Sequence, residues 1–245
     1  MVIVSKKNII RILIAIQIVI FLLFLYTDLY FINRYNKISV NLKFSTIVLC
    51  FIFTLLIGKD CYNKRDRCLV QLARFFTIIA DYFLLIKEDF KLGVICFCIV
   101  QITYIIRHSL MEIEAYKNLI FLFFFLLISI FTLTVININN FDRKLLALGI
   151  IYAVFLITSV YCGVSTLKRG KFPKEGALLI SIGIILFLFC DINVGLFNIV
   201  DFIGFAQYEK LTGFLIWVFY FPSQLLLSLS GFNLKYLKEL FKEYI

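Results

Sequence analysis

Eight long apolar runs, separated by short charged segments, dominate the pattern along the chain. They cover residues 9–27, 39–58, 69–86, 91–110, 118–137, 144–166, 176–198 and 211–231. About 20 apolar residues suffice for a helix to cross the hydrocarbon core of a bilayer. The pattern therefore predicts an all-α fold, a polytopic membrane helix bundle with eight transmembrane helices. The connecting segments are short, so we expect one integral membrane domain over residues 1–245.

Composition and charge agree with this prediction. Hydrophobic residues make up 62% of the chain, whereas soluble domains average about 45–50%. The net charge of +10 would suggest nucleic acid in a soluble protein. Here roughly twice as many Lys and Arg fall on the N-terminal side of the predicted membrane as on the other side, which follows the positive-inside rule. We expect contacts with anionic membrane lipids and no nucleic-acid partner. We also expect the protein to lie in a bacterial plasma membrane, with both termini in the cytoplasm.

Two acidic residues lie deep inside these runs, where charge is costly. Asp81 stands in the third run, within FFTIIADYFLLI, and Asp191 stands in the seventh, within IGIILFLFCDINVG. Ionisable groups at membrane depth are rare and mark functional sites by default. We therefore take Asp81 and Asp191 as the candidate catalytic residues.

Small and polar residues recur three, four and seven positions apart on the third, fourth, seventh and eighth runs. Residues at these spacings share a helix face, and polar groups inside a bilayer need partners within the protein. We expect the four faces to meet around one pocket in the outer half of the bundle. The predicted supporting residues are Lys43, Gln101, Tyr104, Tyr220 and Gln224.

Structural interpretations compete with this prediction. Gln101 and Gln224 would serve equally well as hydrogen-bonding links between helices, and the two tyrosines as packing aromatics. Lys43 lies near the outer surface, where it can snorkel, or it pairs with the aspartates and only locks the bundle. Arg74, near the cytoplasmic end of its run, is expected to snorkel as well.

The residue inventory argues against a metal centre. His108 is the only histidine, which removes the multi-histidine sites of zinc hydrolases. Cys61 and Cys68 flank a predicted cytoplasmic loop, without the second Cys or His pair of a zinc site. We predict neither a metal nor an organic cofactor.

Three short motifs carry a family resemblance. They consist of Ala80 and Asp81 followed by Phe90, Gly93, Phe97, Gln101 and Tyr104, then Gly183, Phe187, Cys190 and Asp191, and finally Trp217, Tyr220, Ser223 and Gln224. In order and spacing the chain resembles the lysoplasmalogenase family of YhhN-like membrane proteins, and Lys43 with Phe44 stands where that family has Lys-Pro. Gln101 replaces a family histidine, which removes a titratable group.

The resemblance implies hydrolysis of the vinyl-ether bond of a lysophospholipid, which releases a fatty aldehyde and a glycerophospho-base. Protonation of the β-carbon of a vinyl ether leaves an oxocarbenium ion that water captures. A carboxyl group removed from water, beside a second carboxylate, tends to keep its proton. Its ionised partner can then stabilise the cation, as in glycosidases. Either aspartate could be the acid, because such a pair titrates as a unit. Lys43 is a candidate phosphate contact.

Two other functional classes remain open at this stage. Buried acids also serve as proton relays in membrane transporters, although the chain shows no inverted repeat. A lipid-binding protein with inert acids is the third option. Aldehyde release from lysoplasmalogen would distinguish the enzyme from both.

Overall fold

A computed structural model describes residues 5–30, 37–109, 143–199, 206–233 and 235–236. Its long helices are α1 (Lys6–Tyr30), α2 (Lys37–Leu55), α3 (Lys64–Asp81), α4 (Phe90–Ser109), α6 (Arg143–Arg169), α7 (Lys174–Ile199) and α8 (Glu209–Leu229). Three short helices, Gly58–Asp60, Tyr82–Ile86 and Ala206–Tyr208, lie between them. The all-α prediction is confirmed.

Seven helices of the described residues are long and apolar enough to cross a membrane. They coincide, within a few residues at each end, with seven of the eight predicted runs. The remaining predicted run, 118–137, lies outside the described residues. Many large apolar side chains point outward, such as Leu22 at 58% and Tyr161 at 57% exposure. An apolar outer surface is expected where a helix faces lipid.

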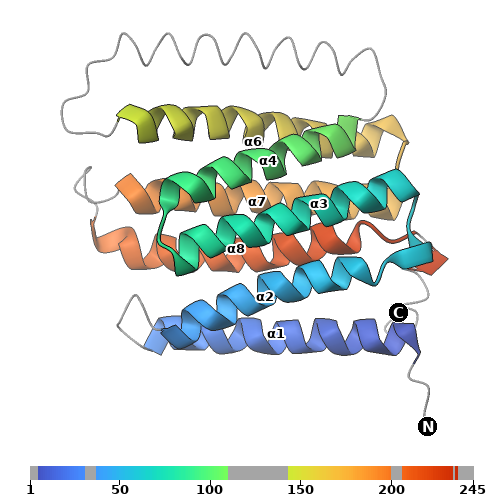
Figure 1. The fold of residues 1–245 in the computed structure, drawn as a ribbon, viewed down its shortest axis with the longest axis horizontal. Helices are drawn as coiled ribbons and strands as arrows, with labels where there is room; N and C mark the ends of the chain where they lie inside the picture. The colour runs from blue at the N-terminus through green and yellow to red at the C-terminus, as the bar shows by residue number, and fades with distance from the viewer. Residues whose placement is uncertain (1–4, 31–36, 110–142, 200–205, 234, 237–245) are drawn as a thin grey trace.

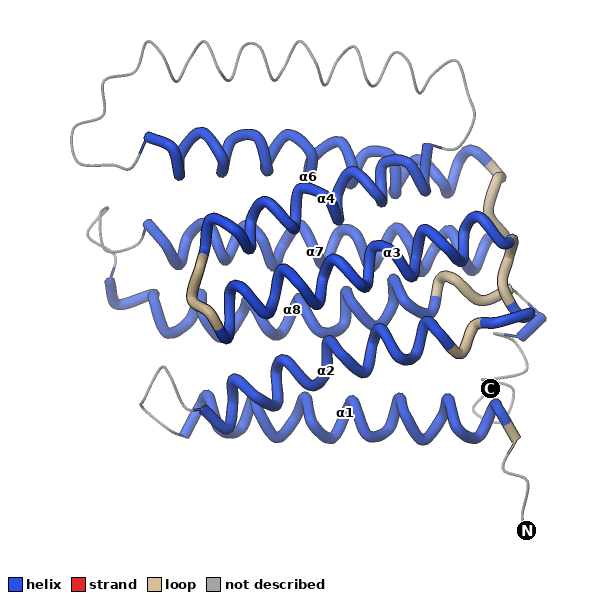
Figure 2. The backbone as a smooth tube through the Cα atoms, viewed as in Figure 1, coloured by secondary structure: helices blue, strands red, loops and turns tan. Residues whose placement is uncertain are grey.

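The long helices run side by side along the length of the bundle (Figure 1). One end holds the start of α1, the α2–α3 and α6–α7 connections and the close of α8; we call it the N-terminal end. The other end holds the turn between α3 and α4 and the starts of α6 and α8 (Figure 1). Described loops are short at both ends (Figure 2), as the sequence predicts. Under the predicted topology, the N-terminal end is cytoplasmic.

Two glycines permit close contacts between the helices that carry the aspartates and their neighbours. A Cβ atom on Gly93 of α4 would lie 2.5 Å from the side chain of Leu84 and 3.3 Å from the carbonyl oxygen of Ala80. A Cβ atom on Gly183 of α7 would lie 2.8 Å from the Leu227 side chain on α8. Real Cβ atoms do not approach so closely, so these positions fix the separation of α3 from α4 and of α7 from α8.

A buried ion pair closes the N-terminal end. The Arg107 guanidinium on α4 donates to both carboxylate oxygens of Asp66 on α3, at 2.7 and 3.2 Å. It also donates to the hydroxyl and carbonyl oxygens of Ser230, at 2.9 and 3.1 Å. The side chains of Arg107 and Asp66 are fully buried. Removing one partner of such a pair would leave an uncompensated charge, so this contact ties α3 and α4 to the close of α8.

Candidate active site

Asp81 is the last residue of α3 and is only 3% exposed. The Tyr220 hydroxyl on α8 donates a hydrogen bond to its Oδ2 atom at 2.6 Å. A π-helical turn, Tyr82–Ile86, follows at once, and Lys87 N–H donates to the Tyr82 carbonyl across it. Such turns often occur at functional sites. The α-helical geometry of α3 therefore ends at the acid itself.

Asp191 lies on α7 and is approached by a short chain of hydrogen bonds. The Tyr152 hydroxyl on α6 donates to its Oδ2 atom at 2.5 Å. The Gln101 side-chain amide on α4 donates in turn to the Tyr152 oxygen at 3.3 Å. Gln101 therefore reaches the acid through a tyrosine. Tyr152 was missed by the sequence analysis, because one tyrosine in an apolar run looks like an ordinary packing residue.

Aromatic rings fill the space between the two acid–tyrosine pairs. Phe97 on α4 contacts both tyrosine rings, with centroids 6.4 Å from Tyr152 and 6.4 Å from Tyr220. Phe187 on α7 lies 5.9 Å from Phe97 and 5.8 Å from Tyr220. Trp217 lies 5.4 Å from Tyr220. We call Phe97, Phe187, Trp217 and Tyr220 the aromatic wall.

The two carboxyl groups are connected through their tyrosines, whose rings both contact Phe97. They come from α3 and α7, which lie far apart in the sequence. That the two acids act together in catalysis stays a prediction. The structure brings Asp81, Asp191, Gln101 and Tyr220 into one connected region.

Arg74 does not snorkel, and that prediction is wrong. Its side chain is buried inside the bundle at 1% exposure. Its Nη1 donates to the Gln224 side-chain oxygen on α8, and its guanidinium carbon lies 5.6 Å from the centre of the Tyr104 ring on α4. The error came from the helix boundary. The apolar run starts at residue 69, but α3 starts at Lys64, so Arg74 lies about 15 Å into the helix.

Tyr104 and Gln224 thus surround Arg74, and neither side chain hydrogen-bonds to Asp81 or Asp191 in the described part of the chain. Tyr104 is fully buried and also stacks on His108, with centroids 5.5 Å apart. The predicted polar stripes do face one another. They divide into a region around the acids and a second region around Arg74, about two helical turns nearer the N-terminal end.

Lys43 occupies the opposite end and is paired with Asp28 of α1. Its ammonium nitrogen lies 2.7 Å from the Asp28 Oδ2 atom, and Ser39 donates to the other oxygen at 2.5 Å. The ammonium also lies 5.0 Å from the Trp217 ring centre, so it borders the aromatic wall. The structural alternative, in which Lys43 pairs with Asp81 or Asp191, is wrong.

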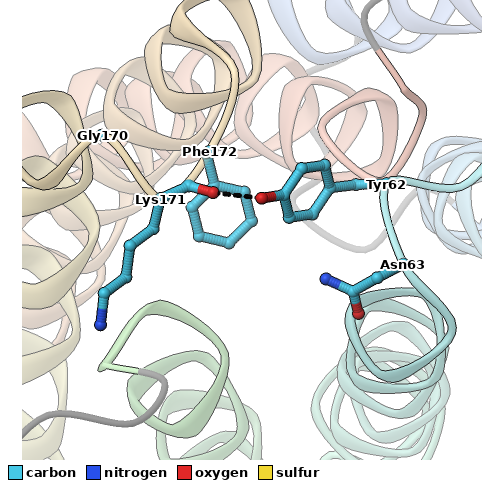
Figure 3. Close-up of a pocket in the computed structure, with 5 residues that line it drawn as sticks. All are labelled: Tyr62, Asn63, Gly170, Lys171 and Phe172. Carbon is cyan, nitrogen blue, oxygen red and sulfur yellow. Dashed lines mark hydrogen bonds between the residues drawn. The ribbon is translucent and has the colours of Figure 1, made fainter.

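An open hollow of about 420 Å³ lies at the N-terminal end, away from the acids. Its lining residues are Tyr62, Asn63, Gly170, Lys171 and Phe172 (Figure 3). The Tyr62 hydroxyl donates to the Lys171 carbonyl oxygen across it (Figure 3). Backbone turns and one lysine carry no catalytic chemistry, so the buried acids remain the candidate active site. Among the described residues, no three His, Cys, Asp or Glu side chains gather as metal ligands would.

Comparison with known families now decides the assignment. The family model described as the YhhN family matches residues 38–231. The chain belongs to the YhhN family. The matched region runs from α2 into the close of α8, so it contains both acids and both tyrosines that bind them. The resemblance drawn from the three motifs is thereby confirmed. Searches of curated proteins and of solved structures find no match.

Proposed function

We propose that this YhhN-family protein is a membrane-embedded hydrolase that cleaves the vinyl-ether bond of lysoplasmalogens. The products are a fatty aldehyde and a glycerophospho-base. The observation that carries the proposal is the pair of membrane-buried aspartates, each held by a tyrosine hydroxyl. Family membership supports the same reaction class.

The reaction needs one proton donor and one ionised carboxylate. A protonated aspartate transfers its proton to the β-carbon of the vinyl ether, and the double bond becomes an oxocarbenium ion. The other aspartate, ionised, stabilises this cation and takes a proton from the attacking water. The oxygen of that water joins the α-carbon and forms a hemiacetal. The hemiacetal then collapses. The aspartate that took the proton from water gives it to the glycerol oxygen, which leaves as an alcohol, while the other aspartate takes the hydroxyl proton and the aldehyde is released.

The tyrosines act as positioning residues in this scheme. Tyr220 and Tyr152 each donate to the Oδ2 atom of one aspartate, which fixes the carboxyl plane. The Oδ1 atoms are then directed to the substrate. Catalysis depends on such fixed geometry, because reacting atoms must approach to about 3 Å. The aromatic wall offers an apolar surface for the alkenyl chain beside the acids.

The test is aldehyde release from lysoplasmalogen by the purified protein in detergent. Asp81→Asn and Asp191→Asn keep the side-chain volume and remove the transferable proton. We expect each to lose at least about 100-fold in turnover, the low end for general acid–base catalysis. Glu88→Gln is the matched control, because Glu88 is an exposed carboxylate seven residues after Asp81. It should retain full activity.

Near-normal aldehyde release by either aspartate variant would contradict the acid–base pair. A wild-type protein that releases no aldehyde but carries protons into liposomes would favour the transporter. A lysophospholipid with a saturated alkyl ether serves as the substrate control, because it has no double bond to protonate and should yield no aldehyde.

A further inference from the structure

Arg74 lies on the same face of α3 as Asp81, seven residues before it. Seven residues are two turns of helix, or about 10 Å along the axis. Among the described residues, the guanidinium and the Asp81 carboxyl form no ion pair within 4 Å. The hydrogen bond to Asp81 comes from Tyr220 instead. Arg74 therefore lies two helical turns from Asp81, and its charge is not taken up by an ion pair with that acid.

The hydrogen-bonding capacity of Arg74 is mostly unused. Nη1 is bound by Gln224, but Nε and Nη2 are buried and have no hydrogen-bond partner among the residues that the structure describes. The other buried guanidinium provides the contrast, because Arg107 donates to both oxygens of Asp66 and to Ser230. A buried charge without a partner is costly. The cost suggests that a ligand completes the site around Arg74.

The groups next to Arg74 are also unpaired, and they can all donate. Gln224 holds the guanidinium through its oxygen, and within the described ranges its amide nitrogen Nε2 has no hydrogen-bond partner. The same holds there for the buried Tyr104 hydroxyl, on the ring beside the guanidinium. A positive charge together with several free donors suits an anion with several oxygens, and a guanidinium matches phosphate oxygens well.

We propose that Arg74, with Gln224 and Tyr104, binds the phosphate group of the lysolipid substrate. This inference rests on the proposed hydrolase function and adds the contact that selects a phospholipid. In a lysoplasmalogen about seven bonds separate phosphorus from the vinyl β-carbon, an extended reach of about 8–9 Å at ordinary bond lengths. That reach matches the two-turn offset between Arg74 and Asp81, so the phosphate and the vinyl ether can be held at the same time.

Lys43, the phosphate contact expected from the sequence, is less suited to this role than Arg74. Lys43 already has Asp28 as a carboxylate partner at 2.7 Å. A phosphate there would compete with an anion already in place. In the part of the chain that the structure describes, Arg74 has no carboxylate within ion-pair distance.

Binding of an uncleavable ligand separates this proposal from the catalytic one. The probe is a lysophosphoethanolamine with a saturated alkyl ether, compared with the alkylglycerol that lacks the phosphate. Trp217 is the single tryptophan of the chain and contacts Tyr220, so its fluorescence reports on ligand at the aromatic wall. Wild type should bind the phospholipid at least about tenfold more tightly, since hydrogen bonds to charged groups are worth this much.

Arg74→Gln should abolish that preference while affinity for the alkylglycerol changes less than about threefold. Arg65→Gln, an exposed arginine on the same helix, is the matched control and should bind both ligands as wild type does. Equal weakening of both ligands by Arg74→Gln would show a purely structural role and overturn the proposal. Loss of the preference in Lys43→Gln, with Arg74→Gln unaffected, would overturn it as well.

Two further measurements complete the design. If Arg74→Gln does not fold, Arg74→Lys keeps the charge; it should fold and lose most of the preference, because Lys cannot bind phosphate through two parallel donors. Glycerophosphoethanolamine should displace the phospholipid probe from wild type. Displacement by inorganic phosphate alone would instead assign a free-phosphate site and overturn the lipid assignment. A protein without aldehyde release that still shows Arg74-dependent preference would refute the proposed function and leave the phosphate site standing.

Discussion

Replacing Tyr152 by phenylalanine tests whether a hydrogen bond, and not only the aspartate itself, sets the rate. The substitution removes one oxygen atom and keeps the ring that contacts Phe97. It deletes the 2.5 Å bond to Asp191, a length typical of strong O–H to carboxylate bonds. Hydrogen bonds to charged groups contribute about 1.5–3 kcal/mol. That range corresponds to roughly a 10- to 150-fold loss of turnover.

The assay is aldehyde release at saturating lysoplasmalogen, with the amount of folded protein measured in parallel. Tyr161→Phe is the matched control, because Tyr161 lies on the same helix and is 57% exposed. Its activity should stay within twofold of wild type. The loss in Tyr152→Phe should appear in kcat, with KM little changed, because Tyr152 orients the acid and does not hold the lipid.

Gln101 provides an internal check on this reasoning. Its bond to Tyr152 is long, at 3.3 Å, so Gln101→Leu should cost about 0.5–1.5 kcal/mol, or roughly 2- to 13-fold. In the Tyr152→Phe background the same change should cost nothing further, because the oxygen it acts on is gone. If Tyr152→Phe turns over as fast as wild type, or if the two losses simply add, the hydrogen-bond chain does not position Asp191.

Four other outcomes are expected. Gln101→His should keep activity within about tenfold, because a neutral imidazole can also donate to Tyr152; a large gain with a new titration near pH 6–7 would make this position a proton-transfer site. Asp66→Asn should lower stability in detergent by about 3–5 kcal/mol, measured by thermal unfolding, without changing turnover per folded molecule. Gly183→Ala should destabilise by about 1–3 kcal/mol, whereas Gly195→Ala, where a Cβ atom meets nothing within 4 Å, should not. A reporter fused after Ile245 should be active in the cytoplasm, and activity only outside would reverse the topology.

The helices and the acids were predictable because each leaves a strong one-dimensional signal. A run of 20 apolar residues has few structural outcomes, so the ranges of α1, α2 and α7 followed from counting. Asp81 and Asp191 were found by their cost at membrane depth. Both predictions could be made without knowing how one helix is rotated against another.

Of the two tyrosines that bind the acids, Tyr220 was expected from its helix face, but Tyr152 could not be predicted, because its position depends on that rotation. Tyr152 is one aromatic residue in an apolar run and gives no signal until α6 turns its hydroxyl toward Asp191. The position of Arg74 depended on where α3 begins, and apolar runs locate helix ends poorly because polar residues continue the helix beyond them. The π-helical turn after Asp81 was likewise invisible in the sequence pattern.

A bound phosphate would give Arg74 the close anionic partner that Lys43 and Arg107 already have. Lys43 has Asp28 and Arg107 has Asp66, so each of these cations is neutralised by its own carboxylate. Arg74 is left as one positive charge beside two acids that must carry a single proton between them for the proposed reaction. A bound phosphate would neutralise Arg74, so the aspartates would stabilise the forming oxocarbenium ion without an opposing positive charge nearby. A ligand without phosphate would leave Arg74 near that cation and raise the barrier by repulsion. The phosphate contact should therefore favour lysophospholipids in turnover as well as in binding.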